Sequence, residues 1–235
     1  MPKSAVRETY HYLVGSVGHW SAPVSRTLDE RVRDTLIPRR SREAFVAAVR
    51  SAAAAGLTAG TLSEASIRLG QEKFAITTRT CRASAITEDD LTVAALHDRW
   101  VIGREELPRF APLHRLFYRA TAAGAVLLTQ PVAALTIAAR RLAPPAHLLA
   151  DAAADVGDLI CFDFQPGDDV LAETDDANWP AIATELIAII SERQALLLPG
   201  YGLLTWGNDL GQAVARAEAV ERWCAIALNY YDANE

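Results

Sequence analysis

The chain has 235 residues, of which 51% are hydrophobic and 22% charged, which is an ordinary balance for one folded domain. Its net charge of -6 at pH 7 argues against a nucleic-acid surface, which is usually basic, so no nucleic-acid partner is expected. Three widely spaced cysteines suggest no disulfide framework, and the N-terminus lacks the pattern of a secretion signal, so a cytoplasmic location is predicted.

The first 40 residues are predicted to be an N-terminal extension packed on the main domain, which covers residues 41–235. Apolar residues recur every four positions from Val24 to Leu36 and predict one face of a short helix that Pro38 ends. Ser41 then caps a second predicted helix that stops at Gly56.

Two short strands and a capped turn follow. Alternating residues predict a half-buried strand over 65–69, a turn at 70–72 and a partner strand over 73–77. Thr87 and Asp90 have the spacing of a capping box, which predicts a single helical turn before the next apolar run.

The central part of the chain predicts a helix from Pro112, a buried strand over 125–130 and a helix over 131–141. This is the most apolar region, but it falls short of the ~20 apolar residues that a membrane span needs, so no membrane association is expected. A further helix over 147–157 and a strand over 158–164 are predicted next.

The C-terminal part begins with a predicted polar loop over 165–180. A helix with Ile182, Leu186 and Ile189 on its inner face, two short strands around Gly200–Gly202 and a long helix over 208–228 complete the chain. Helices and strands alternate without a strict βαβ rhythm. The predicted fold is therefore a single three-layer α/β domain, with a mixed, mainly antiparallel sheet and helices on both faces.

Six phrases occur in a recognisable order: GLTAGTLSEASIR (56–68), FAITTRT (74–80), ITEDDL (86–91), PRFAPLH (108–114), GAVLLTQP (124–131) and LLPGYGLLTWG (197–207). From about Ser41 onward the chain resembles the class II aldolase/adducin family, which includes sugar-phosphate aldolases, related epimerases and the head domain of adducin. The resemblance implies the three-layer fold and a homo-oligomer, commonly a tetramer.

The resemblance also shows where this chain departs from the family. The family's aldolases hold zinc with three histidines, whose positions here are Leu128, Gln130 and Tyr201. Leu128 has no donor atom, an amide is a poor zinc ligand, and a phenol must lose a proton with an ordinary pKa near ~10. The family's acid/base glutamate falls on Phe110, which transfers no protons. Neither a metal nor another cofactor is therefore expected.

The phosphate-binding positions of the family have changed as well. They are Ser63–Glu64, Arg79–Thr80 and Pro108–Arg109 in this chain. Glu64 is expected to repel a phosphate, whereas Arg79 and Arg109 together could clamp a phosphate or carboxylate.

The candidate catalytic residues are Tyr201 and His114, and the candidate ligand-binding residues are Arg79, Arg109, Thr129, Gln130 and Ser63. Each has a structural alternative. Tyr201 could fill the space left by zinc, and His114 could be a buried hydrogen-bonding residue. The two arginines could be solvated or bridge acidic neighbours such as Glu64, and Thr129 with Gln130 could cap a strand end.

Two functions follow from these residues. The first is a metal-independent enzyme (a lyase, isomerase or cyclase) that binds a small anionic or oxygen-rich ligand in the old active-site pocket. The second is a non-catalytic assembly or partner-binding protein, like the adducin head, because Leu128 and Phe110 would fill the pocket with apolar bulk.

Overall fold

The computed structural model describes residues 31–97, 101–102, 107–163 and 181–234, the last range without the side chains of 181–183. Its centre is a seven-stranded sheet in the order β4-β3-β2-β1-β5-β7-β6, in which every paired strand is antiparallel. The strands are β1 (Glu64–Arg68), β2 (Lys73–Thr77), β3 (Leu91–Ala95), β4 (Val101–Ile102), β5 (Ala125–Thr129), β6 (Ala195–Leu198) and β7 (Gly202–Gly207).

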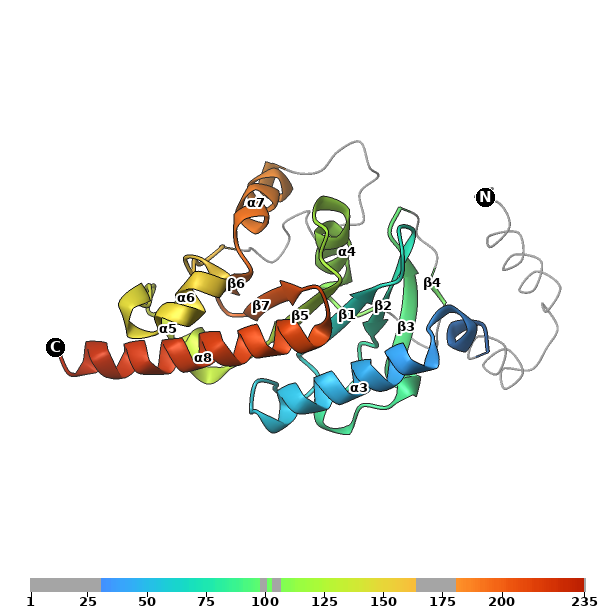
Figure 1. Cartoon of the computed structure of the whole chain (residues 1–235), viewed down its shortest axis with the longest axis horizontal. Coiled ribbons are helices and arrows are strands. Elements are labelled where there is room, and N and C mark those ends of the chain that lie inside the picture. The colour runs from blue at the N-terminus through green and yellow to red at the C-terminus, as the bar shows by residue number, and fades with distance from the viewer. Residues whose placement is uncertain (1–30, 98–100, 103–106, 164–180, 235) are drawn as a thin grey trace.

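Helices cover both faces of this sheet, as Figure 1 shows, with α3 and α8 on one face and α4 and α7 on the other. The buried side chains form two hydrophobic clusters, one on each face, so the predicted three-layer α/β architecture is confirmed. The helices are α3 (Arg39–Ala54), α4 (Ala111–Ala120), α5 (Val132–Ala139), α6 (Ala150–Val156), α7 (Ala181–Glu192) and α8 (Leu210–Asp232), with short 3₁₀ turns η1 (Ala83–Ala85), η2 (Glu88–Asp90) and η3 (Ala146–Leu148).

Local sequence signals account for several of these elements. The β1–β2 hairpin has the predicted turn. Gly70 adopts a φ of +77° there, which residues with a side chain rarely adopt. Thr87 and Asp90 form the predicted capping box of η2. Asp209 caps α8 by accepting a hydrogen bond from the backbone N–H of Gln212.

The predicted strand over 158–164 is wrong for its described part. Residues 158–163 form no strand there and make only an isolated parallel bridge between Cys161 and Leu197 of β6. Leu159 and Phe162 are nevertheless buried. An apolar run predicts burial, but it does not predict whether a full hydrogen-bonded ladder forms. The predicted loop over 165–180 lies outside the described residues.

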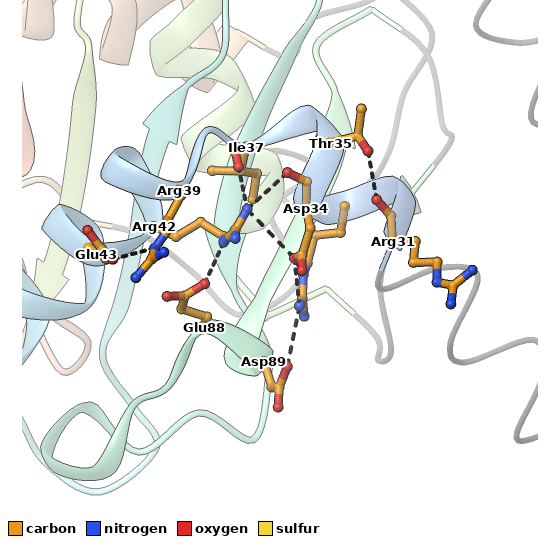
Figure 2. A network of polar contacts seen from close by, with 10 residues as sticks. Arg31, Asp34, Thr35, Ile37, Arg39, Arg42, Glu43, Glu88 and Asp89 are labelled. Carbon is orange, nitrogen blue, oxygen red and sulfur yellow. Dashed lines mark hydrogen bonds and ion pairs between the residues drawn. The ribbon is translucent and has the colours of Figure 1, made fainter.

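The segment before α3 is fixed to the core by a network of polar contacts, shown in Figure 2. Arg42 donates to Glu88 at 2.5 Å and to the carbonyl oxygens of Asp34 and Ile37 at 2.9 and 2.7 Å. The Arg33 guanidinium reaches Asp89 at 3.3 Å. Residues 31–37 therefore pack on η2, while most of the predicted extension lies outside the described residues.

Candidate active site

Sheet register brings most of the predicted site residues to one edge of the molecule. Glu64, the first residue of β1, pairs with Leu128 near the end of β5, and Thr129 pairs with Leu203 near the start of β7. The N-terminus of α4 meets the same edge, because the backbone N–H of Phe110 contacts Glu64. This region lies at the ends of the central strands β1, β5 and β7, beside residues 109 and 110. We call it the sheet-edge site.

Gln130 ties the segments of this site together. Its Oε1 accepts a hydrogen bond from Ser63 Oγ at 2.6 Å, and its Nε2 donates to the carbonyl oxygens of Leu62 at 2.9 Å and Tyr201 at 3.4 Å. Thr129 is fully buried and donates to the carbonyl oxygen of Leu203. The side chains of Ser63, Thr129 and Gln130 thus hold the protein itself together at this edge.

An exposed cation lies over two aromatic rings at the surface of the site. The Arg109 guanidinium carbon is 5.4 Å from the centre of the Phe110 ring and 5.1 Å from that of Tyr201. The two rings meet edge to face with their centres 5.5 Å apart. Phe110 is buried, Tyr201 is partly exposed and Arg109 is exposed. This arrangement presents a positive charge outward, which suits an anionic ligand.

Next to Phe110 lies the carboxyl group of Glu64, which was expected to repel a phosphate or to pair with the arginines. The backbone N–H of Phe110, at the start of α4, donates to both carboxyl oxygens of Glu64 at 3.1 and 3.2 Å. Burial raises the pKa of Glu64 to about 7, although the Phe110 hydrogen bond and the charge of Arg109 act in the opposite direction. The carboxyl group can therefore change its charge near neutral pH.

A buried polar chain extends from Glu64 into the core. The Nε2 of His114 lies 3.7 Å from Glu64 Oε2, its Nδ1 lies 2.6 Å from Ser66 Oγ, and Ser66 Oγ lies 2.7 Å from the hydroxyl of Tyr118. Burial lowers the pKa of His114 to about 3, so its ring is neutral. His114 is fully buried and contacts Glu64 rather than the surface.

The sequence contained a signal for this chain that the motif comparison missed. Glu64 and Ser66 are two apart on a strand and so share one face of it. His114 and Tyr118 are four apart on a helix and likewise share one face. Two polar pairs with matching periodicities indicate a buried polar contact between a strand and a helix.

Arg79 is exposed in the segment after β2. The β1–β2 register pairs Ser66 with Ile76, and its continuation beyond the strands would place Arg79 opposite Ser63. Its convergence with Arg109 on one ligand stays a prediction.

Within the described residues, no three His, Cys, Asp or Glu side chains are grouped so that they could hold a metal ion. No helix in this part of the chain is both long and apolar enough to cross a membrane. All three cysteines are free thiols.

Comparison with known proteins places this chain in a family. Residues 43–228 match the model of the class II aldolase and adducin N-terminal domain. The chain is 33% identical over 186 residues to a methylthioribulose-1-phosphate dehydratase of Stenotrophomonas maltophilia strain K279a, covering 74% of this chain and 83% of that protein.

A longer relative in Nocardia farcinica is described as a probable bifunctional methylthioribose-1-phosphate isomerase/methylthioribulose-1-phosphate dehydratase. It is 29% identical over 200 residues, and the match covers 78% of this chain but only 34% of that protein. Among solved structures, L-fuculose-1-phosphate aldolase from Thermus thermophilus has the same fold, with a TM-score of 0.67, 22% identity and coverage of 80% of this chain and 93% of that one. The chain therefore belongs to the class II aldolase and adducin N-terminal domain family.

Proposed function

We propose that the sheet-edge site binds a small phosphorylated, oxygen-rich ligand and that the protein acts on it as a metal-independent lyase. The observation that carries this proposal is the exposed Arg109 guanidinium, held over Phe110 and Tyr201 and next to the buried carboxyl group of Glu64. The two relatives described above are named as dehydratases, which are lyases that remove water. A ketose phosphate is therefore the first substrate class to test.

The donor chemistry of the site does not fit a catalytic zinc ion. Leu128 offers no donor atom and is fully buried, and both ends of the Gln130 amide already make hydrogen bonds within the protein. A catalytic zinc site needs three nitrogen, sulfur or carboxylate ligands. We propose that this chain has lost the family's zinc and, with Phe110 in place of a glutamate, its usual proton carrier.

The ligand-facing groups then have separate roles. Arg109, with Arg79 as a proposed second cation, holds the phosphate, and the Tyr201 hydroxyl donates a hydrogen bond to a ligand oxygen. Ser63, Thr129 and Gln130 fix the shape of the edge through the hydrogen bonds described above.

Binding after metal removal tests this proposal. Protein treated with EDTA should bind methylthioribulose 1-phosphate in a calorimeter and convert it with loss of water, as measured by mass spectrometry. Arg109→Ala should weaken binding about tenfold or more, because one charge-assisted contact contributes roughly 1.5–3 kcal/mol. Arg222→Ala, an exposed arginine on α8, is the matched control and should bind like wild type.

If neither this ketose phosphate nor inorganic phosphate binds, or if Arg109→Ala and Arg222→Ala bind alike, the sheet-edge site is not a phosphate site.

Assembly or partner binding, as for the adducin head, is the second candidate. Two large apolar side chains adjoin the same edge and are exposed, Leu62 at 63% and Val132 at 74%. A homo-oligomer, with the tetramer as the first state to test, could cover them. Light scattering of wild type and a Leu62→Ser/Val132→Ser variant tests this, and an unchanged mass in both would contradict it.

A further inference from the structure

We infer that Glu64 is the proton-transferring residue of the sheet-edge site, with His114 as its positioning residue. This inference rests on the proposed lyase function and assigns its chemistry to a residue that the family resemblance placed among phosphate contacts. The family's own acid/base position holds Phe110, so another group must move the proton if the reaction occurs.

The position of Glu64 is the first support. Its side chain is 6% exposed and lies at the boundary between the core and the sheet-edge site, where the N–H of Phe110 holds both carboxyl oxygens. The charged or titratable groups that act on it are Arg109 and His114, both from the α4 side, while β5 presents the apolar Leu128. A ligand phosphate on Arg109 would therefore bring a ligand carbon towards this carboxyl group.

Phe110 connects the cation to the carboxyl group. Its backbone N–H donates to Glu64, and the Arg109 guanidinium lies over its ring and that of Tyr201. The charge of Arg109 also acts on the Glu64 carboxyl group. An anion bound to Arg109 would therefore lie close to Glu64.

The second support is an unsatisfied atom aimed at Glu64. His114 Nε2 is buried and has no hydrogen-bond partner, although Glu64 Oε2 lies 3.7 Å away. A buried polar atom without a partner is costly and needs an explanation. A small approach of the two groups would supply the missing hydrogen bond.

His114 can also match either charge state of Glu64. With the carboxylate ionised, Nε2–H faces it, and Nδ1 accepts from Ser66, which accepts from Tyr118. With the carboxyl group protonated, Nε2 can accept from it while Nδ1–H donates to Ser66. A neutral imidazole with two tautomers thus accommodates a proton that leaves and returns.

The electrostatics agree with this geometry. Because burial brings the pKa of Glu64 to about 7, the group can accept a proton and give it back near neutral pH. An exposed glutamate, with an ordinary pKa near ~4.3, would be a weaker base in the same position.

The proposed elimination is balanced with this single group. The Glu64 carboxylate takes the proton from the carbon beside the ligand's carbonyl, and the C–H electron pair forms a double bond to the carbonyl carbon, giving an enolate. The enolate then re-forms the carbonyl, and the hydroxyl leaves from the carbon on the other side of the deprotonated carbon, which creates a carbon–carbon double bond. The Glu64 carboxyl proton joins this hydroxyl to release water, and Glu64 returns to the carboxylate.

The decisive experiment is a pH–rate profile on the full chain treated with EDTA, with methylthioribulose 1-phosphate as the probe. Wild-type kcat should rise about tenfold per pH unit below the pKa of Glu64 and level off above it. Glu64→Gln should lower kcat by ~100-fold or more, with calorimetric binding of the probe unchanged, whereas Glu64→Asp should retain part of the rate. Glu72→Gln, at the exposed turn of the same hairpin, is the matched control and should behave like wild type.

The role of His114 has its own readout. His114→Asn can keep a hydrogen bond to Ser66 but removes the ring nitrogen that faces Glu64. It should shift the apparent pKa of the pH–rate profile while KM changes little, and a thermal melt checks that the variant is folded. An unshifted profile in a folded variant would overturn the positioning role.

The remaining outcomes separate this inference from the proposed function. Binding and turnover by wild type with full activity of Glu64→Gln would overturn the inference and leave the lyase function standing. Binding without turnover by wild type would overturn proton transfer and leave only ligand binding. Neither binding nor turnover would overturn both.

Discussion

Two polar clusters lie at opposite ends of the β5–β7 strand pair, and they differ in how completely their polar groups are hydrogen-bonded. At the end near Gly207, the Arg216 guanidinium makes four hydrogen bonds: two to Asp155 at 2.9 and 3.0 Å, one to Gln194 at 3.0 Å and one to the carbonyl oxygen of Trp206 at 2.6 Å. At the other end, His114 Nε2 makes no hydrogen bond, although it lies 3.7 Å from Glu64 Oε2.

The carboxyl groups of the two clusters also differ in burial, since the Asp155 side chain is 48% exposed and that of Glu64 only 6%. The hydrogen bond from Arg216 lowers the pKa of Asp155, whereas burial raises that of Glu64. A cluster in which every polar group is hydrogen-bonded stabilises the fold. A buried acid with a raised pKa lowers the stability of the fold when it ionises, and such acids are typical of functional sites. The Arg216 cluster is therefore expected to stabilise the fold, and the contrast supports the proposed functional role of Glu64.

The largest expected effect is on the structural cluster. Arg216→Ala should lower the free energy of unfolding by roughly 3–4 kcal/mol, because it leaves the buried carbonyl oxygen of Trp206 and the Gln194 side chain without their donor. Urea denaturation measures this, with Arg222→Ala on the same helix as the control. A loss below about 1 kcal/mol would show that the cluster is not a structural anchor.

Glu64→Gln should raise the free energy of unfolding at high pH, in contrast to Arg216→Ala. The folded state holds the Glu64 proton up to a pKa of about 7 and the unfolded state only to about 4.5, so wild-type stability falls as pH rises through this interval. At pH 8 the variant should be more stable than wild type by up to roughly 3 kcal/mol, and the gain should vanish near pH 4. Urea denaturation at both pH values measures this, with Glu72→Gln as the control. A gain in stability that did not depend on pH would contradict the raised pKa of Glu64.

His114 should produce an opposing pH dependence. Its folded pKa of about 3 lies below the unfolded value of 6.5, so its contribution to stability is lost as pH falls below 6.5. Glu64→Gln removes the compensating slope of Glu64. The variant, unlike wild type, should therefore lose stability steadily from pH 6.5 to 4.5, by up to roughly 2–3 kcal/mol.

A smaller loss is expected from Ser66→Ala. The change leaves the buried His114 Nδ1 and Tyr118 hydroxyl without the oxygen that joins them, at a cost of about 2 kcal/mol. Thermal and urea unfolding should show this loss, while Ser51→Ala on the exposed surface of α3 should stay within about 0.5 kcal/mol of wild type. Equal stability of the two variants would mean that the buried chain contributes little to folding.

The smallest loss of stability is expected from removal of a helix cap. Asp209→Ala removes the N-cap of α8, whose Oδ1 accepts from Gln212 N at 2.8 Å, and should cost about 1 kcal/mol. Asp209 adjoins the end of β7 that carries the Arg216 cluster. If this loss equals that of Arg216→Ala, the four hydrogen bonds of the arginine are worth no more than a single cap.

The sequence predicted the elements that local patterns specify. The β1–β2 hairpin, the capping box at Thr87 and the long C-terminal helix depend on alternation, turn residues and caps within a few positions of each other. The predicted strand over 158–164 failed because its apolar residues are buried in either case, and only the neighbouring β6 decides whether a ladder forms.

The sequence by itself thus determined the family and the three layers, because motif order and periodicity are local properties. It did not determine that Glu64 would be buried against the start of α4, 46 positions further along the chain. That required β1 to pair with β5 and α4 to pack over them, which excludes water from the carboxyl group and places His114 Nε2, a nitrogen without a hydrogen-bond partner, 3.7 Å from it. Only the tertiary structure decides such desolvation. Water solvates the Glu64 carboxylate in the unfolded chain, whereas in the folded protein its pKa depends on segments that are distant in the sequence.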